Sequence, residues 1–147
     1  MYKRILVATD GSDLSTKAVD QAMSLAHTCN AELIALKVIP RYPQSYFEGA
    51  IALEPTEIKN VEKKWADAGQ AVVDEVKKQG EAKGLQVKAL VAKDDVVSDA
   101  ILAAAKKHHC DLIVMASHGR KGIQKLLLGS ETQHVLTQAT LPVLILK

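Results

Sequence analysis

Short apolar runs alternate along the chain with longer segments in which apolar residues recur every three or four positions. Runs of this length, bounded by charged residues, glycine or proline, are typical of strands buried on both faces of a parallel sheet. The runs occupy residues 5–9, 32–39, 86–92, 112–115 and 142–146. We therefore predict five strands.

The longer segments have the spacing of amphipathic helices. We predict a helix from the turn at residues 10–13 to about Thr28, and a long one from near Thr56 to Lys83, where Gly84 suits a helix end. The other two span residues 96–109, where Asp94 and Asp95 can cap the helix, and 131–138.

Alternating strands and helices predict one α/β domain over residues 1–147, with a doubly wound, Rossmann-like parallel sheet covered on both faces. Crossovers should be right-handed, and ligands should bind at the carboxyl ends of the strands where the winding reverses. The irregular segment 41–54 is long for a compact domain, which suggests a lid or an interface element.

Composition narrows the function classes. The chain is 48% hydrophobic and 24% charged, as is ordinary for a globular protein, and no apolar run approaches the roughly 20 residues that span a membrane. The first apolar run is too short for a signal peptide, so a cytoplasmic location is the default. A net charge of +2 and 3% aromatic residues argue against nucleic-acid binding. Cys29 and Cys110 are too few for a disulfide framework, and we expect buried or half-buried thiols.

The segment Met115-Ala116-Ser117-His118-Gly119-Arg120 is the most informative. It follows the fourth apolar run, and nine residues separate Gly119 from Gly129-Ser130, where a helix is expected to begin. A strand, a basic loop with glycine and a helix N-terminus together form a common phosphate site, because backbone N–H groups and the helix dipole point at the anion. The segment therefore indicates a nucleotide site.

Asp10 stands at the carboxyl end of the first strand. If the first and fourth strands are neighbours, its carboxylate faces the glycine loop and can accept hydrogen bonds from a ribose or a base amine. Alternatively, Asp10 starts a turn or caps the first helix together with Ser12 and Asp13.

The residues around Gly129 also have two interpretations. Ser130 and Gln133 have the spacing of a capping box, although a helix N-terminus left open would still suit an anion. Glu131 favours the helix dipole but would repel a phosphate if it pointed into the site, an effect that Arg120, Lys121 and Lys125 would offset. His118 could touch phosphate or orient the turn, and Gly119 and Gly129 could be turn glycines without any ligand.

Other nucleotide and catalytic motifs are absent. The chain has no Gly-x-Gly-x-x-Gly after Asp10, no P-loop sequence, no Gly-x-Ser-x-Gly and no zinc-site spacing of Cys and His. No residue is an evident general base for water, so efficient catalysis is not expected.

Three segments resemble the universal stress protein family, and the resemblance extends over essentially the whole chain. They are residues 5–12, residues 115–120 with Gly129-Ser130 at the matching spacing, and residues 141–146. The resemblance implies the sheet order 3-2-1-4-5, with the first and fourth strands side by side. It also implies a homodimer that pairs the last strands, which would cover an apolar edge.

The ATP-binding branch of that family carries Gly-x-x-Gly, nine residues, then Gly-[Ser/Thr]. Ala116 replaces the first glycine here and adds a methyl group near the ribose, whereas Gly119, Gly129 and Ser130 match. By resemblance, Asp10 contacts adenine or ribose and the Val38 backbone bonds adenine. Magnesium would arrive with the triphosphate, since no dedicated protein ligand set is visible. The full expected binding set is Ala8, Thr9, Asp10, Val38, Met115, Ala116, His118, Gly119, Arg120, Gly129, Ser130, Glu131 and Thr132.

Within this expected set, Ala8 and Met115 line the base, Ala116 lies beside the ribose, and Gly119, Gly129 and the N–H groups from Ser130 onward take the phosphates. The expected function is a cytoplasmic, ATP-binding regulator of the stress response. Slow ATP hydrolysis or autophosphorylation stays open, with Ser117 and Ser130 as the nearby hydroxyls.

Two other hypotheses compete with a nucleotide-binding regulator. One is a homodimeric interaction module of the same fold that needs no nucleotide, which Ala116 and Glu131 favour and the spacing of Gly119, Gly129 and Ser130 opposes. The other is a small adenylate-transfer enzyme, which would need a catalytic lysine or an acidic metal cluster that we do not find.

Overall fold

A computed structural model describes residues 1–43, 54–119 and 128–147. Most of the irregular segment 41–54 and the basic residues Arg120, Lys121 and Lys125 therefore lie outside the described residues.

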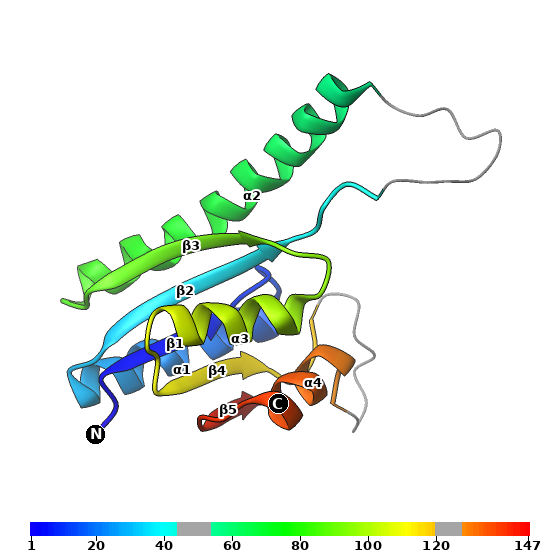
Figure 1. The fold of residues 1–147 in the computed structure, drawn as a ribbon. Helices are drawn as coiled ribbons and strands as arrows, with labels where there is room; N and C mark the ends of the chain where they lie inside the picture. The colour runs from blue at the N-terminus through cyan, green and yellow to red at the C-terminus, as the bar shows by residue number, and fades with distance from the viewer. Residues whose placement is uncertain (44–53, 120–127) are drawn as a thin grey trace.

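The described elements alternate strand and helix along the whole chain (Figure 1). They are β1 (Arg4–Ala8), α1 (Asp13–Cys29), β2 (Glu32–Ile39), α2 (Pro55–Ala82), β3 (Val87–Lys93), α3 (Val97–Lys107), β4 (Leu112–Ala116), α4 (Ser130–Gln138) and β5 (Val143–Leu146). The strands form one sheet in the order β3-β2-β1-β4-β5, and every neighbouring pair is parallel. The predicted fold class and the sheet order implied by resemblance are confirmed.

Two apolar layers hold the sheet between its helices. Ile5 and Val7 pack with α1 and α2 on one face, whereas Leu6 packs with α3 and with Val135 of α4 on the other. This division follows from the alternation of side chains along a strand, and it explains why the runs are apolar at nearly every position. None of the described helices is long and apolar enough to cross a membrane.

The winding reverses between β1 and β4. The chain passes from β1 to β2 on one side, while β4, the other neighbour of β1, leads to β5 on the opposite side. The carboxyl ends of β1 and β4 therefore meet at the switch point, where sheets of this kind bind ligands.

Helix α2 packs against β2 and β3 through two glycines. A Cβ atom built on Gly80 would lie 2.5 Å from Cγ2 of Val87, and one on Gly69 would lie 3.1 Å from Cγ2 of Ile39. The absence of side chains at these positions allows the helix to approach the sheet closely.

The start and end of α3 differ from the prediction. Val96 is the N-cap residue and has no side-chain capping bond, although Asp94 accepts a hydrogen bond from the Val96 N–H at 3.0 Å. Asp95 does not cap the helix, because its carboxylate accepts from the Arg41 N–H and pairs with the Arg41 guanidinium. The predicted end at His109 is wrong as well, since that residue has a φ of 53° and lies beyond the helix.

Candidate functional site

Thr9 shapes the chain where it leaves β1. Its N–H donates to the carbonyl oxygen of Leu36 at 2.9 Å, which extends the pairing with β2 by one residue. Its buried Oγ1 accepts from the Gly11 N–H at 3.2 Å and lies 3.1 Å from Oγ of Ser15. Thr9 therefore fixes the turn that presents Asp10.

The structure confirms that Asp10 starts the turn, and its carboxylate also lies beside the glycine loop, while its contact with a nucleotide stays a prediction. Oδ1 accepts a hydrogen bond from the Ser12 N–H at 2.9 Å, so Asp10 starts the turn, while Ser12 is the N-cap residue of α1 and accepts from the Ser15 N–H. Oδ2 lies toward Gly119, since a Cβ atom built on that glycine would be only 2.6 Å away. The carboxylate of Asp10 therefore faces the chain that follows β4.

The chain beyond β4 is bonded to its neighbours on two sides. The Ser117 N–H donates to the carbonyl oxygen of Leu146 at 2.8 Å, and the Ser117 carbonyl accepts from the Gly129 N–H at 2.8 Å. A Cβ atom on Gly129 would lie 3.2 Å from that carbonyl oxygen. Nδ1 of His118 lies 3.2 Å from Oγ of Ser117. Gly129, separated from Gly119 by nine residues in the sequence, is thus bonded back to the end of β4, close to the point where Gly119 follows that strand.

Helix α4 begins one residue earlier than predicted, and the capping-box interpretation of Ser130 is wrong. Gly129 is the N-cap residue, and its carbonyl accepts from the Gln133 N–H at 3.0 Å. Ser130 is the first helical residue and is exposed, and no side chain caps this end. The start of the helix is set by the bond from Gly129 to Ser117, which a local pattern does not reveal.

The next two residues of α4 are held by other elements. Oγ1 of buried Thr132 donates to the carbonyl oxygens of Ala116 and Ser117, at 3.0 and 3.1 Å. Oε2 of Glu131 accepts from the Ser98 N–H at 2.7 Å, in the first turn of α3. The sequence did not predict that the carboxylate of Glu131 would lie at the positive, amino end of a different helix, α3.

The backbone of Val38 lies beyond the end of β1. The carbonyl of Leu36 points toward β1, and alternation along a strand directs the peptide groups of Val38 to the same side. The Val38 carbonyl accepts from Nζ of Lys37 at 2.9 Å, a contact that sequence reasoning missed. The one hint of this contact in the sequence is Lys37, a charged residue between the apolar residues Leu36 and Val38.

Three residues expected around a base share one face of the sheet. Val38 and Met115 are buried in the apolar layer on the side of α3 and α4, and Ala8 packs against that layer. Ala116, the last residue of β4, is also buried. Among the described residues no group of three His, Cys, Asp or Glu side chains could hold a metal ion.

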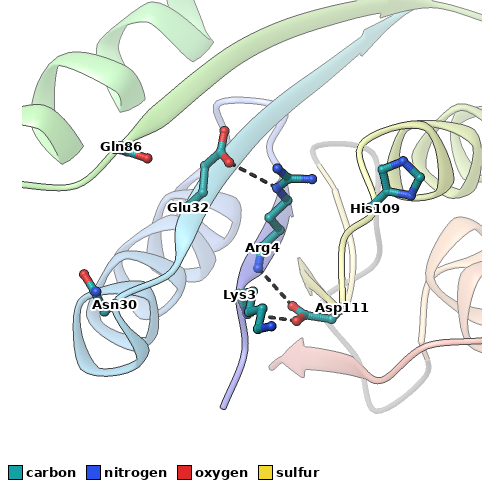
Figure 2. A pocket seen from close by; sticks show the side chains of 7 residues that line it. All are labelled: Lys3, Arg4, Asn30, Glu32, Gln86, His109 and Asp111. Carbon is teal, nitrogen blue, oxygen red and sulfur yellow. Dashed lines mark hydrogen bonds and ion pairs between the residues drawn. The ribbon is translucent and has the colours of Figure 1, made fainter.

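A polar pocket lies at the opposite, amino ends of the strands, and sequence reasoning did not predict it (Figure 2). Its volume is about 460 Å³. Arg4 bonds Glu32 at 3.2 Å across it, and Asp111 accepts from the N–H groups of Lys3 and Arg4. These bonds connect the starts of β1, β2 and β4, so the lining residues stabilise the sheet there.

Comparison with known proteins identifies the family. The sequence model of the universal stress protein family matches residues 1–147. Universal stress protein MJ0531 of Methanocaldococcus jannaschii is 33% identical over 147 residues, which cover 100% of this chain and 83% of that protein.

Solved structures show the same fold. The universal stress protein UspA of Lactobacillus plantarum matches with a TM-score of 0.84 at 22% identity, covering 99% of this chain and 98% of that one. A universal stress protein crystallised in complex with cAMP matches with a TM-score of 0.71 at 29% identity, covering 99% and 97%. The chain belongs to the universal stress protein family.

Proposed function

We propose that this chain binds an adenine nucleotide, ATP with Mg²⁺ carried by its phosphates, at the carboxyl ends of β1 and β4. We propose further that it acts in the cytoplasm as a nucleotide-dependent regulator of the stress response and not as an efficient enzyme. The observation that carries the proposal is the approach of Asp10 to Gly119 beside the amino end of α4. It sets a carboxylate acceptor next to backbone donors and the positive end of a helix dipole.

Each part of the nucleotide has a matching group. Asp10 accepts hydrogen bonds from ribose hydroxyls or the base amine, and the Val38 backbone bonds the base between Ala8 and Met115. Ala116 lies beside the ribose. Gly119 and Ser130 offer N–H groups to the phosphates, with His118 nearby. The Gly129 N–H already donates to Ser117, so Gly129 contributes the room that its missing side chain leaves. Arg120, outside the described residues, completes the expected set. Thr9 and Thr132 hold this frame through their hydrogen bonds to neighbouring elements. The relative that holds cAMP supports an adenine nucleotide as the ligand class.

The test is a calorimetric titration of nucleotide-free protein with Mg·ATP. We expect saturable binding in wild type and none in Gly129→Asp, because the new carboxylate would stand where the phosphates bind and its Cβ would press on the Ser117 carbonyl. Ala68→Asp adds the same charge on an exposed position of α2 and should bind like wild type. Absence of heat in the folded wild-type protein would instead favour the nucleotide-free interaction module.

We also propose that the protein forms a homodimer through β5. This strand pairs with β4 on one side and forms the end of the sheet on the other, and Leu144 is 43% exposed there. An apolar edge strand readily pairs with another strand, so a second copy would cover both its backbone groups and its leucine.

A further inference from the structure

Two adjacent side chains bond the first turn of α4 to two different elements. Thr132 bonds it to the end of β4, as described above, and Glu131 bonds it to α3. The bond from the Ser98 N–H to Oε2 of Glu131 measures 2.7 Å and joins residues 33 positions apart in the sequence. Short charge-assisted bonds of this kind are roughly twice as strong as neutral ones.

The amino end of α3 depends on this bond. Val96, its N-cap residue, supplies no side-chain acceptor, so one of the N–H groups left open in the first turn is satisfied from another helix. Ser98 is fully buried, so its backbone N–H needs an acceptor from the protein because water cannot supply one. The negative charge of Glu131 is thereby directed to the positive end of α3 and is held in a fixed direction relative to its own helix.

We propose that Glu131 is a positioning residue for the phosphate-binding end of α4. By bonding Ser98 it fixes the first turn of α4 against α3, and so fixes the direction of the N–H groups that follow Gly129. The inference rests on the proposed nucleotide function. The opposite account, in which the carboxylate faces the phosphates and repels them, predicts an effect of opposite sign when the charge is removed.

The test compares Glu131→Ala and Glu131→Gln with wild type, using calorimetry for Mg·ATP and an NMR titration for adenosine. Glu131→Ala should weaken ATP binding about fivefold or more, because a charge-assisted bond is lost. Its adenosine affinity should stay within about twofold of wild type, because adenosine carries no phosphate and does not need the ordered turn. Glu131→Gln should restore ATP binding to within about threefold of wild type, since the amide oxygen still accepts from Ser98.

Two further measurements separate the loss of the bond to Ser98 from the loss of a negative charge in general. Glu81→Gln removes one carboxylate at the exposed carboxyl end of α2, at the opposite end of the sheet, and should leave both affinities unchanged. Hydrogen exchange of the Ser98 amide should become faster in Glu131→Ala and not in Glu131→Gln, which reports on the bond itself.

Three results would overturn the inference. Tighter ATP binding in both Glu131 variants would show that the charge repels the phosphates. Equal losses of ATP and adenosine affinity in Glu131→Ala would show a general structural role without positioning. Absence of binding of either ligand to wild type would overturn the proposed function and this inference with it.

Discussion

At the scale of single residues, the two carboxylate oxygens of Asp10 lie in different surroundings. Its Oδ1 closes the turn into α1 by accepting from the Ser12 N–H, which holds the carboxyl group in one orientation. Its Oδ2 is thereby directed toward Gly119. A side chain fixed by such a local bond needs little reorganisation when a ligand binds.

Gly119→Ala tests this arrangement. The new Cβ would lie 2.6 Å from Oδ2 of Asp10, so the carboxyl group must rotate away. Because Gly119 is exposed, we expect a melting temperature close to that of wild type. The affinity for Mg·ATP should fall about tenfold, since Asp10 loses its bond to the ribose or base. An unchanged affinity would show that Asp10 does not contact the nucleotide.

Cys110 gives a second residue-scale prediction. Burial is the main cause that raises the pKa of its thiol from 9.0 to about 11, and neighbouring Asp111 adds to the effect. At pH 8 the reactive thiolate should be about a hundredfold rarer than in the unfolded chain. Iodoacetamide labelling followed by peptide mass spectrometry should therefore be much slower at Cys110 in the native protein. Equal labelling rates before and after denaturation would contradict the burial of this thiol.

At the scale of elements, the site depends on where helices begin. Helix α4 has no side-chain cap of its own, and its first turn is ordered by bonds from Gly129 to Ser117, from Thr132 to β4 and from Glu131 to α3. An end held by its surroundings in this way keeps its N–H groups available for an anion.

Helix α2 offers a prediction about stability. Gly80→Ala should destabilise the protein by about 1–3 kcal/mol, because its Cβ would lie 2.5 Å from the branched side chain of Val87. Gly69→Ala is the matched control. Its contacts of 3.1 and 3.2 Å involve the side chains of Ile39 and Lys37, and the better helix propensity of alanine, about 1 kcal/mol, offsets them. Urea unfolding measures both changes, and equal effects would contradict the close approach at Gly80.

The sequence predicted the elements well and their contacts less well. Buried strands are encoded locally, since each apolar run extends over about one strand, whereas the sheet order came only from the family resemblance. The capping of α4 was misassigned because Ser130 and Gln133 fit a local motif, while the true cap is fixed by Ser117 of another element. The bond between Glu131 and Ser98 joins two helices and leaves no local pattern.

At the scale of the whole molecule, the two ends of the sheet differ in chemistry. The amino ends of β1, β2 and β4 are joined by ion pairs and backbone bonds around Arg4 and Asp111. The carboxyl ends of β1 and β4 bring together the glycines, Asp10 and the start of α4. The bonds at the amino ends stabilise the sheet, whereas the carboxyl ends hold the residues of the proposed nucleotide site.

The proposed dimer belongs to the same scale. Leu144→Lys should convert a dimer to a monomer in sedimentation equilibrium, because a charge on an edge strand opposes pairing with a second copy. Leu136→Lys is the matched control, since this leucine of α4 is 41% exposed against 43% for Leu144. A monomeric wild-type protein, or dimers in both variants, would contradict assembly through β5.

A crystal structure of the protein grown with Mg·ATP tests nucleotide binding at the carboxyl ends of β1 and β4 directly. We expect adenine between Ala8, Val38 and Met115, and the ribose or base amine within hydrogen-bond distance of Asp10. The phosphates should lie at Gly129 and the first N–H groups of α4. A nucleotide bound at another place, such as the polar pocket around Arg4, or a structure at saturating Mg·ATP without nucleotide, would contradict it.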